Sequence, residues 1–461
     1  MKVSPALAEI RFGCGLSPDQ SPKGSVEDIL HRLAGPDHMA AAHPIADFDS
    51  LWPLAAAYTE LRRQRRKTRG TEAYEDVNEQ YKIMRREARF DRTRWFGQLI
   101  LRHSQTEDGF RERLALFWGD HFTAQGKTGL VKLMGAPYVE TAIRPYVSGT
   151  FADLLISAVT HPMMLDYLDQ NRSIGPNSQL AQNSNRSRGL NENLAREVME
   201  LHTLGVGGPY TQQDVRQLAE LFTGLSFKHK TGFRFNAKMA EPGSETVLAK
   251  DYGDDPAQLG QIHAVLGDLA VHPATADHIA RKLVVHFVSD QPDPALVDHI
   301  AGRFRDTGGD LAQVYAALLE HPAAWVPGLQ NVKPPFDFVA SACRALAIQP
   351  AHVNRANPRK LAKRLIRPLD LMGQPWEHSI GPDGWPEEDS SWVTPQGLAA
   401  RMRWAMLAPR QLIKVLPPPD IFVETSLGEF ADGSVQFAAR AAETQAEAIG
   451  LVLSSPAFQR R

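Results

Sequence analysis

The chain has 461 residues, of which 43% are hydrophobic and 23% are charged, and its formal net charge at pH 7 is −2. These values are ordinary for a globular protein with a large core, which needs neither disulfides nor a structural metal to fold. A net charge this close to zero gives no whole-chain reason to expect binding to nucleic acid or to an anionic membrane.

The two cysteines, Cys14 and Cys343, lie far apart in the sequence. This spacing favours two buried thiols in a reducing compartment over a disulfide framework. Residues 1–15 lack the charged and apolar regions of a signal peptide, and no apolar run reaches the roughly 18 residues of a membrane span. We therefore expect a soluble, cytoplasmic protein without a membrane span; export is the alternative if a leader precedes these residues.

Hydrophobic periodicity predicts helices along most of the chain. The predicted helices cover residues 26–33, 73–102, 110–122, 151–160, 191–204, 212–223, 275–288, 294–305, 311–319, 334–347, 398–408 and 438–453. His161, His272 and His321 each precede a proline that opens an apolar run. We interpret these His-Pro pairs as helix starts rather than as metal ligands.

One segment, residues 225–235, alternates apolar and polar residues around Thr231 and Gly232, which predicts a β-hairpin. The sequence therefore predicts an all-α fold, a single large multi-helix array with a small β-hairpin insertion. We expect one helical domain over residues 1–461. Its possible subdivision is an N-terminal helical part at 1–224, a hairpin and loop insertion at 225–260, and a C-terminal helical part at 261–461.

The segment 191–204 carries the densest set of chemical groups in the chain. At helical spacing one polar face collects Glu192, Arg196, Glu200 and Thr203, whereas His202 falls in the middle of the opposite, apolar face. Arg196 is four residues from each of the two glutamates, a spacing typical of helix salt bridges. A surface helix with ion pairs and a core histidine is one interpretation.

The other interpretation is catalytic. Glu200 is the candidate for acid–base work and Glu197, which adjoins the polar face, is its candidate partner, because neighbouring carboxylates push their pKa values apart. The positive charge of Arg196 would influence the ionisation of Glu197 and Glu200. The spacing matches no established metal motif.

A second candidate site is Asp120-His121, which follows the aromatic pair Phe117-Trp118. His121 shares an apolar helical face and is either a core histidine or a ligand or base in an apolar pocket. We therefore name Asp120 and His121 as candidate ligands of a divalent metal, the cofactor that the sequence leaves open.

The loop at residues 373–395 contains three tryptophans among several acids. Indoles beside carboxylates are one way to hold sugar rings, which makes Trp385 and Trp392 candidate substrate-binding residues. The alternative is that the indoles anchor the loop onto the helices, since buried aromatic side chains contribute much apolar area.

The basic run at residues 62–69 is either a phosphate-contacting segment or a solvated helix end. Acids follow it closely and few aromatic residues are interleaved, so we predict no nucleic-acid partner. The chain contains no phosphate-binding loop, dinucleotide fingerprint or serine-hydrolase elbow.

Several blocks of the chain resemble, in order, the bacterial family called domain of unknown function 1800. They include Arg11–Gly15, Phe117–Phe122, Ala142–Arg144, His161–Asp169, Asn191–Gly208 and Lys282–Phe287. The resemblance implies a largely helical fold and, through neighbouring genes, a sulfatase-like protein as partner, but no reaction. The family often has His-Glu-Pro-Gly where this chain has Ala240–Gly243.

Two functional hypotheses follow. The first is a hydrolase-type enzyme that uses paired carboxylates, with or without a divalent metal, on a polymeric or sugar-containing substrate. Glu200 and Glu197 would work with His121 or with Arg144, and Arg196 and Arg144 would stabilise an anion or transition state. The second is a non-enzymatic accessory or chaperone-like partner of another protein. The sequence alone does not give the oligomeric state.

Overall fold

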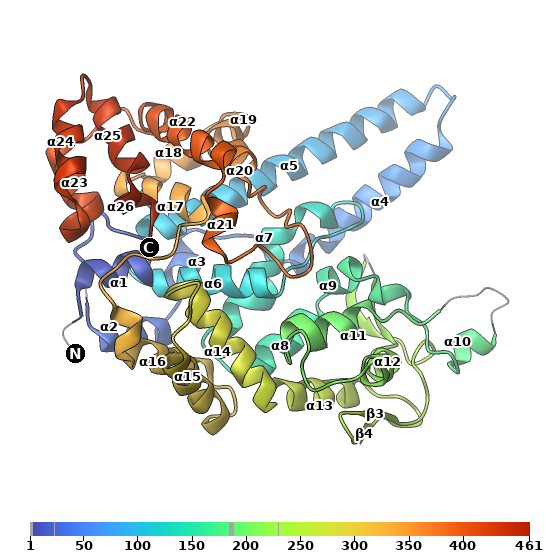
Figure 1. The fold of residues 1–461 in the computed structure, drawn as a ribbon. Helices are drawn as coiled ribbons and strands as arrows, with labels where there is room; N and C mark the ends of the chain where they lie inside the picture. The colour runs from blue at the N-terminus through green and yellow to red at the C-terminus, as the bar shows by residue number, and fades with distance from the viewer. Residues whose placement is uncertain (1–2, 23, 184–188, 229) are drawn as a thin grey trace.

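A computed structural model describes residues 3–22, 24–183, 189–228 and 230–461 of the protein. Within them the fold is helical, with two small antiparallel sheets (Figure 1). This confirms the predicted all-α class. Cys14 and Cys343 are both buried free thiols, as expected. Among the described residues, no helix has both the length and the apolar character needed to cross a membrane.

The N-terminal third builds a long helical hairpin and the helix that leads to the site. In Figure 1, α4 and α5 project together from the body, and α6 returns to its centre. The elements of this part are α1 Pro5–Arg11, α2 Val26–Ala34, α3 His38–Ala42, η1 Asp49–Leu51, α4 Trp52–Lys67, α5 Tyr74–Gln105, α6 Gly109–His121, η2 Val131–Leu133, α7 Gly135–Tyr138, η3 Val139–Ile143 and η4 Arg144–Tyr146.

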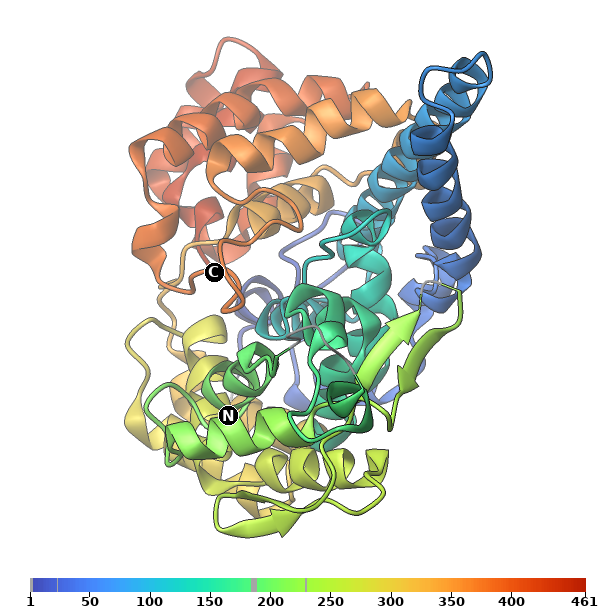
Figure 2. The same ribbon diagram turned by 90° about the vertical axis from the view of Figure 1, so that its right-hand side faces the viewer.

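The middle of the chain, green to yellow, fills most of the lower part of both ribbon views (Figures 1 and 2). Its elements are α8 Phe151–Thr160, α9 Pro162–Tyr167, η5 Gln170–Arg172, α10 Gln179–Gln182, α11 Asn193–Glu197, η6 Val198–His202, α12 Gln212–Leu221, β1 Leu225–Lys228, β2 Gly232–Phe235, β3 Glu245–Val247, β4 Lys250–Tyr252, α13 Leu259–Ala270, α14 Pro273–Phe287, α15 Pro294–Asp306, α16 Leu311–Glu320 and η7 Pro322–Trp325.

The C-terminal helices form a separate group above (Figures 1 and 2). They are α17 Pro335–Ala345, α18 Pro350–Asn354, α19 Pro358–Leu361, η8 Ala362–Ile366, α20 Arg367–Met372, α21 Asp389–Trp392, α22 Pro395–Leu412, α23 Pro419–Leu427, η9 Gly428–Phe430, α24 Gly433–Ala441, α25 Gln445–Ser454 and α26 Pro456–Gln459. The single helix predicted at 438–453 is therefore two helices, α24 and α25.

The predicted His-Pro helix starts are confirmed by their capping geometry. His161, His272 and His321 precede α9, α14 and η7, and in each case the ring Nδ1 accepts a hydrogen bond from the backbone N–H two residues later. The proline at the first helical position has no N–H to leave unsatisfied. These histidines therefore cap helices, which accounts for the recurrence of the motif.

The predicted β-hairpin is present, with Leu225 opposite Phe235 and Lys228 opposite Gly232. Gly232 belongs to the second strand, so the turn lies earlier than the predicted centre at Thr231-Gly232. A second two-stranded sheet, β3 with β4, was not predicted; its strands have only three residues each, too few for the alternation to be recognised.

Two hydrophobic cores meet near α6. The first takes buried residues from Leu7 to Trp325, including residues from each of the stretches 1–224, 225–260 and 261–461. The second joins Phe96, Ile100 and Leu101 of α5 to helices α17–α20 and α22–α26. The loop at residues 373–395 crosses from the second core towards α6, and the candidate site lies beneath it.

Candidate active site

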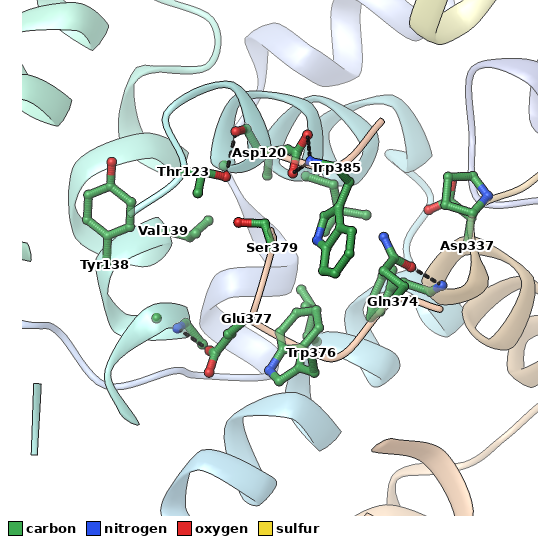
Figure 3. A pocket seen from close by; sticks show the side chains of 18 of the residues that line it. Asp120, Thr123, Tyr138, Val139, Asp337, Gln374, Trp376, Glu377, Ser379 and Trp385 are labelled. Atoms are coloured by element: carbon green, nitrogen blue, oxygen red, sulfur yellow. Dashed lines mark hydrogen bonds between the residues drawn. The ribbon is translucent and has the colours of Figure 1, made fainter. Parts of the chain in front are cut away.

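A cavity of about 190 Å³ lies beneath residues 373–395, which we call the tryptophan loop. Its walls come from α6, from residues 123–140 and from the start of α17, so both cores contribute to it. Trp376, Trp385 and Trp392 all line the cavity. Figure 3 shows the side chains of Trp376 and Trp385 on one side of the space and that of Tyr138 on the other.

The tryptophans hold the loop and also form the cavity wall. Trp376 packs against Phe96 and Phe336, with ring centroids 5.0 and 5.3 Å away. Trp392 is buried, and its Nε1 donates to the carbonyl of Pro386. Trp385 is half-buried, and its ring centroid lies 6.2 Å from that of Trp392. Both predicted roles, loop anchor and binding surface, are compatible with this arrangement.

Polar contacts at both ends of the loop hold it over the cavity. Glu377, which has a left-handed backbone (φ 59°), accepts hydrogen bonds from Arg92 Nε at 2.6 Å and from the backbone N–H of Ala136 at 2.7 Å. At the other end, the backbone N–H of Trp385 donates to both carboxylate oxygens of Asp120, at 3.0 and 3.1 Å. Asp120 therefore connects the last turn of α6 to the loop.

Gly384 makes this contact possible. Its φ is +81°, and a Cβ at this position would lie 2.6 Å from Asp120 Oδ2. We expect Gly384→Ala to destabilise the protein by about 1–3 kcal/mol, because both the backbone conformation and the contact disfavour a side chain. Urea denaturation measures the change. Gly267→Ala in α13, where a Cβ meets nothing within 4 Å, is the control; an equal loss in both variants would contradict the argument.

Asp120 is placed so that it keeps a proton near neutral pH. Burial raises the pKa of its carboxyl, and the negative charge of Glu387 raises it further, to about 8. The ammonium of Lys282 and the Trp385 N–H oppose the shift without cancelling it. A carboxyl with this pKa can donate a proton at the pH at which most proteins work.

Glu387 lines the same cavity but behaves in the opposite way. Burial alone would raise its pKa; the hydrogen bond from His286 and the positive charges of Arg461 and Lys282 outweigh burial and lower it. His286 Nδ1 lies 2.8 and 2.9 Å from the two Glu387 oxygens. Because Arg113 donates to His286 Nε2 at 3.0 Å, Nδ1 carries the ring proton and donates it to Glu387. The cavity thus contains two carboxyls with oppositely shifted pKa values.

The raised pKa of Asp120 predicts a dependence of stability on pH. The folded protein keeps this proton up to about pH 8, whereas the unfolded chain loses it near pH 4. Unfolding therefore releases a proton in this window, and the contribution of Asp120 to stability falls as pH rises, by up to about 1.4 kcal/mol per pH unit. The unfolding free energy of Asp120→Asn relative to wild type should increase from about pH 5 to about pH 8 in urea titrations. A pH-independent difference would contradict the shift.

His121 points away from this cavity into the first core. Its Nε2 donates to the carbonyl of His202 at 3.2 Å, and its Nδ1 accepts from Lys282 Nζ at 3.1 Å. Burial lowers the pKa of His121 and lowers that of His202 to about 3, so both rings are neutral. His202 lies in the core, as its place on the apolar face predicts.

The metal-ligand prediction for Asp120 and His121 gains no support from this geometry. Both nitrogens of His121 have partners, and the Asp120 oxygens receive a backbone N–H. In the described ranges, no group of three or more His, Cys, Asp or Glu side chains is arranged to hold a metal ion.

The opening segment, residues 191–204, is not one regular helix. It consists of α11, Asn193–Glu197, followed by the π-helix η6, Val198–His202. Thr203, predicted on the polar face, is instead buried and donates to the carbonyl of Val198. The wider π-turn changes the register of the last residues, which the regular periodicity could not reveal.

The ion pairs of that segment are present as predicted. Arg196 contacts Glu192 at 3.2 Å and Glu200 at 3.4 Å, and all three side chains are about one-third exposed. Burial raises the pKa of Glu197, as do the charges of Glu200 and Asp383. Arg196, Glu197 and Glu200 are not among the residues that line the tryptophan-loop cavity.

Arg144 does line the cavity, but its guanidinium is already occupied. It makes two hydrogen bonds to Glu112, at 2.6 and 2.8 Å, and two to Asp37, at 2.6 and 2.9 Å. Arg144 and Glu112 are buried. These contacts make Arg144 the centre of a buried ion network between η4, α6 and α3.

Ala240, where the resembling family often has histidine, lies away from the cavity. It is buried, and its neighbour Glu241 accepts from the backbone N–H of Asn177 at 2.8 Å. Neither residue is among those that line the cavity. The departure at Ala240 therefore leaves the Asp120–Glu387 site intact.

Sequence reasoning missed Glu387 as a site residue. Its signal was weak: it is one of several acids in the tryptophan loop, two residues after Trp385. His286 hydrogen-bonds Glu387, and the charge of Lys282 lowers the pKa of Glu387. Both residues lie in a block that resembles the family, but neither of them was assigned a role from the sequence. Only the fold brings the loop to α6 and α14.

The comparison with known families agrees with the resemblance described from the sequence. Residues 9–460 match the family described as protein of unknown function (DUF1800). The chain belongs to this family. No curated protein and no solved structure matches the chain. For this DUF1800 protein, the arrangement of the cavity residues is therefore the basis for any functional proposal.

Proposed function

We propose that the protein is a hydrolase that cleaves a sugar-containing polymer in the tryptophan-loop cavity. The observation that carries the proposal is the pair formed by Asp120 and Glu387, which line one cavity with pKa values shifted in opposite directions. Hydrolysis by a general acid and a general base requires one protonated and one ionised carboxyl in the same cavity.

In the proposed reaction Asp120 gives its proton to the leaving oxygen as the bond to the sugar carbon breaks. A water molecule forms the new bond to that carbon and gives a proton to Glu387. Glu387 then releases its proton to solvent and Asp120 takes one up, which restores the starting protonation states. The neutral His286 orients Glu387 through its Nδ1–H, and it is therefore a positioning residue rather than a catalytic one.

The tryptophans supply the binding surface in this proposal. The indole of Trp385 is partly exposed, and the backbone N–H of the same residue bonds Asp120. The ring of Trp392 lies 6.2 Å from that of Trp385. An apolar ring face is a suitable surface for the C–H groups of a sugar ring, and indole is the largest such face among the side chains. Trp385→Ala is expected to raise KM more than it lowers kcat.

The proposal is tested by measuring new reducing ends released from a panel of neutral and acidic polysaccharides. Wild type should release them from at least one member, Asp120→Asn and Glu387→Gln should not, and Glu200→Gln should retain the activity. Loss of activity in Glu200→Gln with retention in Asp120→Asn would instead assign the reaction to the carboxylates of the opening segment.

A further inference from the structure

The α4–α5 hairpin carries a groove whose charged side chains are all cationic. The groove has a volume of about 370 Å³ and runs between the two helices and η2. Arg62, Arg85, Arg89 and Lys132 line it, together with His378 of the tryptophan loop, and no carboxylate does. All five side chains are exposed. The chain as a whole has a net charge of −2, so this concentration of positive charge is local.

These four cations differ from other basic residues of the hairpin. Arg63, Lys82 and Arg94 each pair with a carboxylate three residues before them on the same helix. Across the described part of the chain, no ion pair involves Arg62, Arg85, Arg89 or Lys132. Like charges held together without counter-charges repel one another, and binding of an anion relieves that repulsion.

The floor of the groove is rigid. Tyr58 of α4 and Tyr81 of α5 share a hydrogen bond of 2.7 Å between their hydroxyls, and their rings are 5.1 Å apart. Together with Ala88 and Leu130 they form a small core under the groove. The cations therefore project from a packed base that fixes their spacing.

A second groove continues the first along α5. It has a volume of about 350 Å³, shares Tyr81, Arg85 and Arg89 with the first, and adds Arg359 of α19. It too is lined by cations and aromatic residues without a carboxylate. Arg85 and Arg89 thus lie at the centre of a continuous basic track.

The basic track adjoins the tryptophan-loop cavity. His378 lines the groove, while its neighbours Glu377 and Ser379 line the cavity. A second segment also borders both spaces: Lys132 lines the groove, and Gly135, three residues later in the chain, lines the cavity. The groove and the cavity therefore lie on either side of the contact between Glu377 and Ala136, and one extended ligand that occupies both must cross over this contact.

We infer that the substrate is an acidic polysaccharide, whose carboxylate or sulfate groups lie in the basic groove while a sugar unit occupies the cavity. This inference rests on the proposed hydrolase function for the cavity but concerns a different set of residues. Two N–H groups of an arginine guanidinium can donate at once to two oxygens of a carboxylate or sulfate group. A nucleic acid is the other polyanion that could follow the basic track; we favour the polysaccharide because the adjoining cavity holds Asp120 and Glu387, the carboxyl pair of the proposed glycoside hydrolysis.

Binding measured apart from turnover tests the inference. The probes are polygalacturonate, dextran sulfate, neutral dextran and single-stranded poly(U), and affinity is measured by calorimetry at low and moderate salt. Wild type should bind at least one of the two acidic polysaccharides, more weakly as salt rises, and bind neutral dextran and poly(U) weakly or not at all. Arg85→Ala/Arg89→Ala should lose about tenfold in affinity, the effect of two exposed charge contacts.

The matched control is Arg403→Ala/Arg410→Ala, which removes two exposed arginines from α22 and should leave affinity unchanged. Failure to bind either acidic polysaccharide, equal binding of neutral dextran, or tighter binding of poly(U) would overturn the inference, as would normal affinity in the groove variant.

The two proposals fail in different ways. If the groove variant loses binding but wild type cleaves none of the polysaccharides, the hydrolase proposal fails and the binding track remains. If Asp120→Asn loses turnover while the groove variant binds and turns over acidic polysaccharide normally, the groove inference fails and the hydrolase proposal remains. A groove variant with raised KM and unchanged kcat supports both.

Discussion

Asp120→Asn is expected to lower kcat for the polysaccharide that wild type cleaves by about 10²–10⁴-fold, the usual contribution of a positioned general acid. Asparagine keeps an oxygen that can accept the Trp385 N–H, so the loop contact of Asp120 is preserved. It cannot donate an acidic proton. Kinetics of reducing-end release measure the loss, and circular dichroism checks that the helices are intact.

The pH profile separates a catalytic from a structural effect of this substitution. With Asp120 as proton donor, wild-type activity should fall as pH rises through about 8, where its carboxyl ionises. The residual activity of Asp120→Asn should lack this alkaline limb. Unchanged kcat in Asp120→Asn, or a variant that keeps the alkaline limb, would show that Asp120 does not supply the proton.

Arg144→Ala is expected to destabilise the protein by about 3–5 kcal/mol, because it leaves Glu112 as an uncompensated buried charge. Glu112 is 1% exposed, and its carboxylate accepts two of the four hydrogen bonds of Arg144. Burial raises the pKa of Glu112, but Arg144 outweighs burial and lowers it. Urea denaturation at neutral pH measures the difference.

Arg196→Ala is the matched control, since Arg196 also pairs with two acids but at a partly exposed site. Its loss should cost no more than about 1 kcal/mol. The double variant Glu112→Gln/Arg144→Met should be less destabilised than Arg144→Ala, because the buried negative charge of Glu112 is removed as well. An Arg144→Ala variant with normal stability but no turnover would instead assign Arg144 a role towards the substrate.

Local patterns in the sequence predicted local structure well. The ion pairs of Arg196 follow from four-residue spacing, and the prolines after His161, His272 and His321 mark real helix starts. The helix at Phe151–Thr160 has the predicted bounds. Each of these features depends on residues within a few positions of one another, where periodicity and capping chemistry act.

The site depends on long-range contacts that no local pattern contains. Asp120 and Trp385 are 265 residues apart. The pKa of Asp120 depends on Glu387 of the tryptophan loop and Lys282 of α14, and that of Glu387 depends on His286 of α14. The adjacent residues Asp120 and His121 were grouped as one candidate metal site, yet they face the cavity and the first core respectively. The π-helix at Val198–His202 was missed because regular helical periodicity was assumed there.

The central claim is that Asp120 holds a proton near neutral pH beside an ionised Glu387. The most direct test is carbon-13 NMR titration of protein labelled at aspartate side-chain carboxyls, with Asp120→Asn to assign the resonance. We expect one aspartate carboxyl to titrate with a pKa of about 8 and to be missing from the variant. If the resonance that disappears in Asp120→Asn titrates with an ordinary pKa of about 4, Asp120 is ionised at neutral pH and the proposed acid–base pair is contradicted.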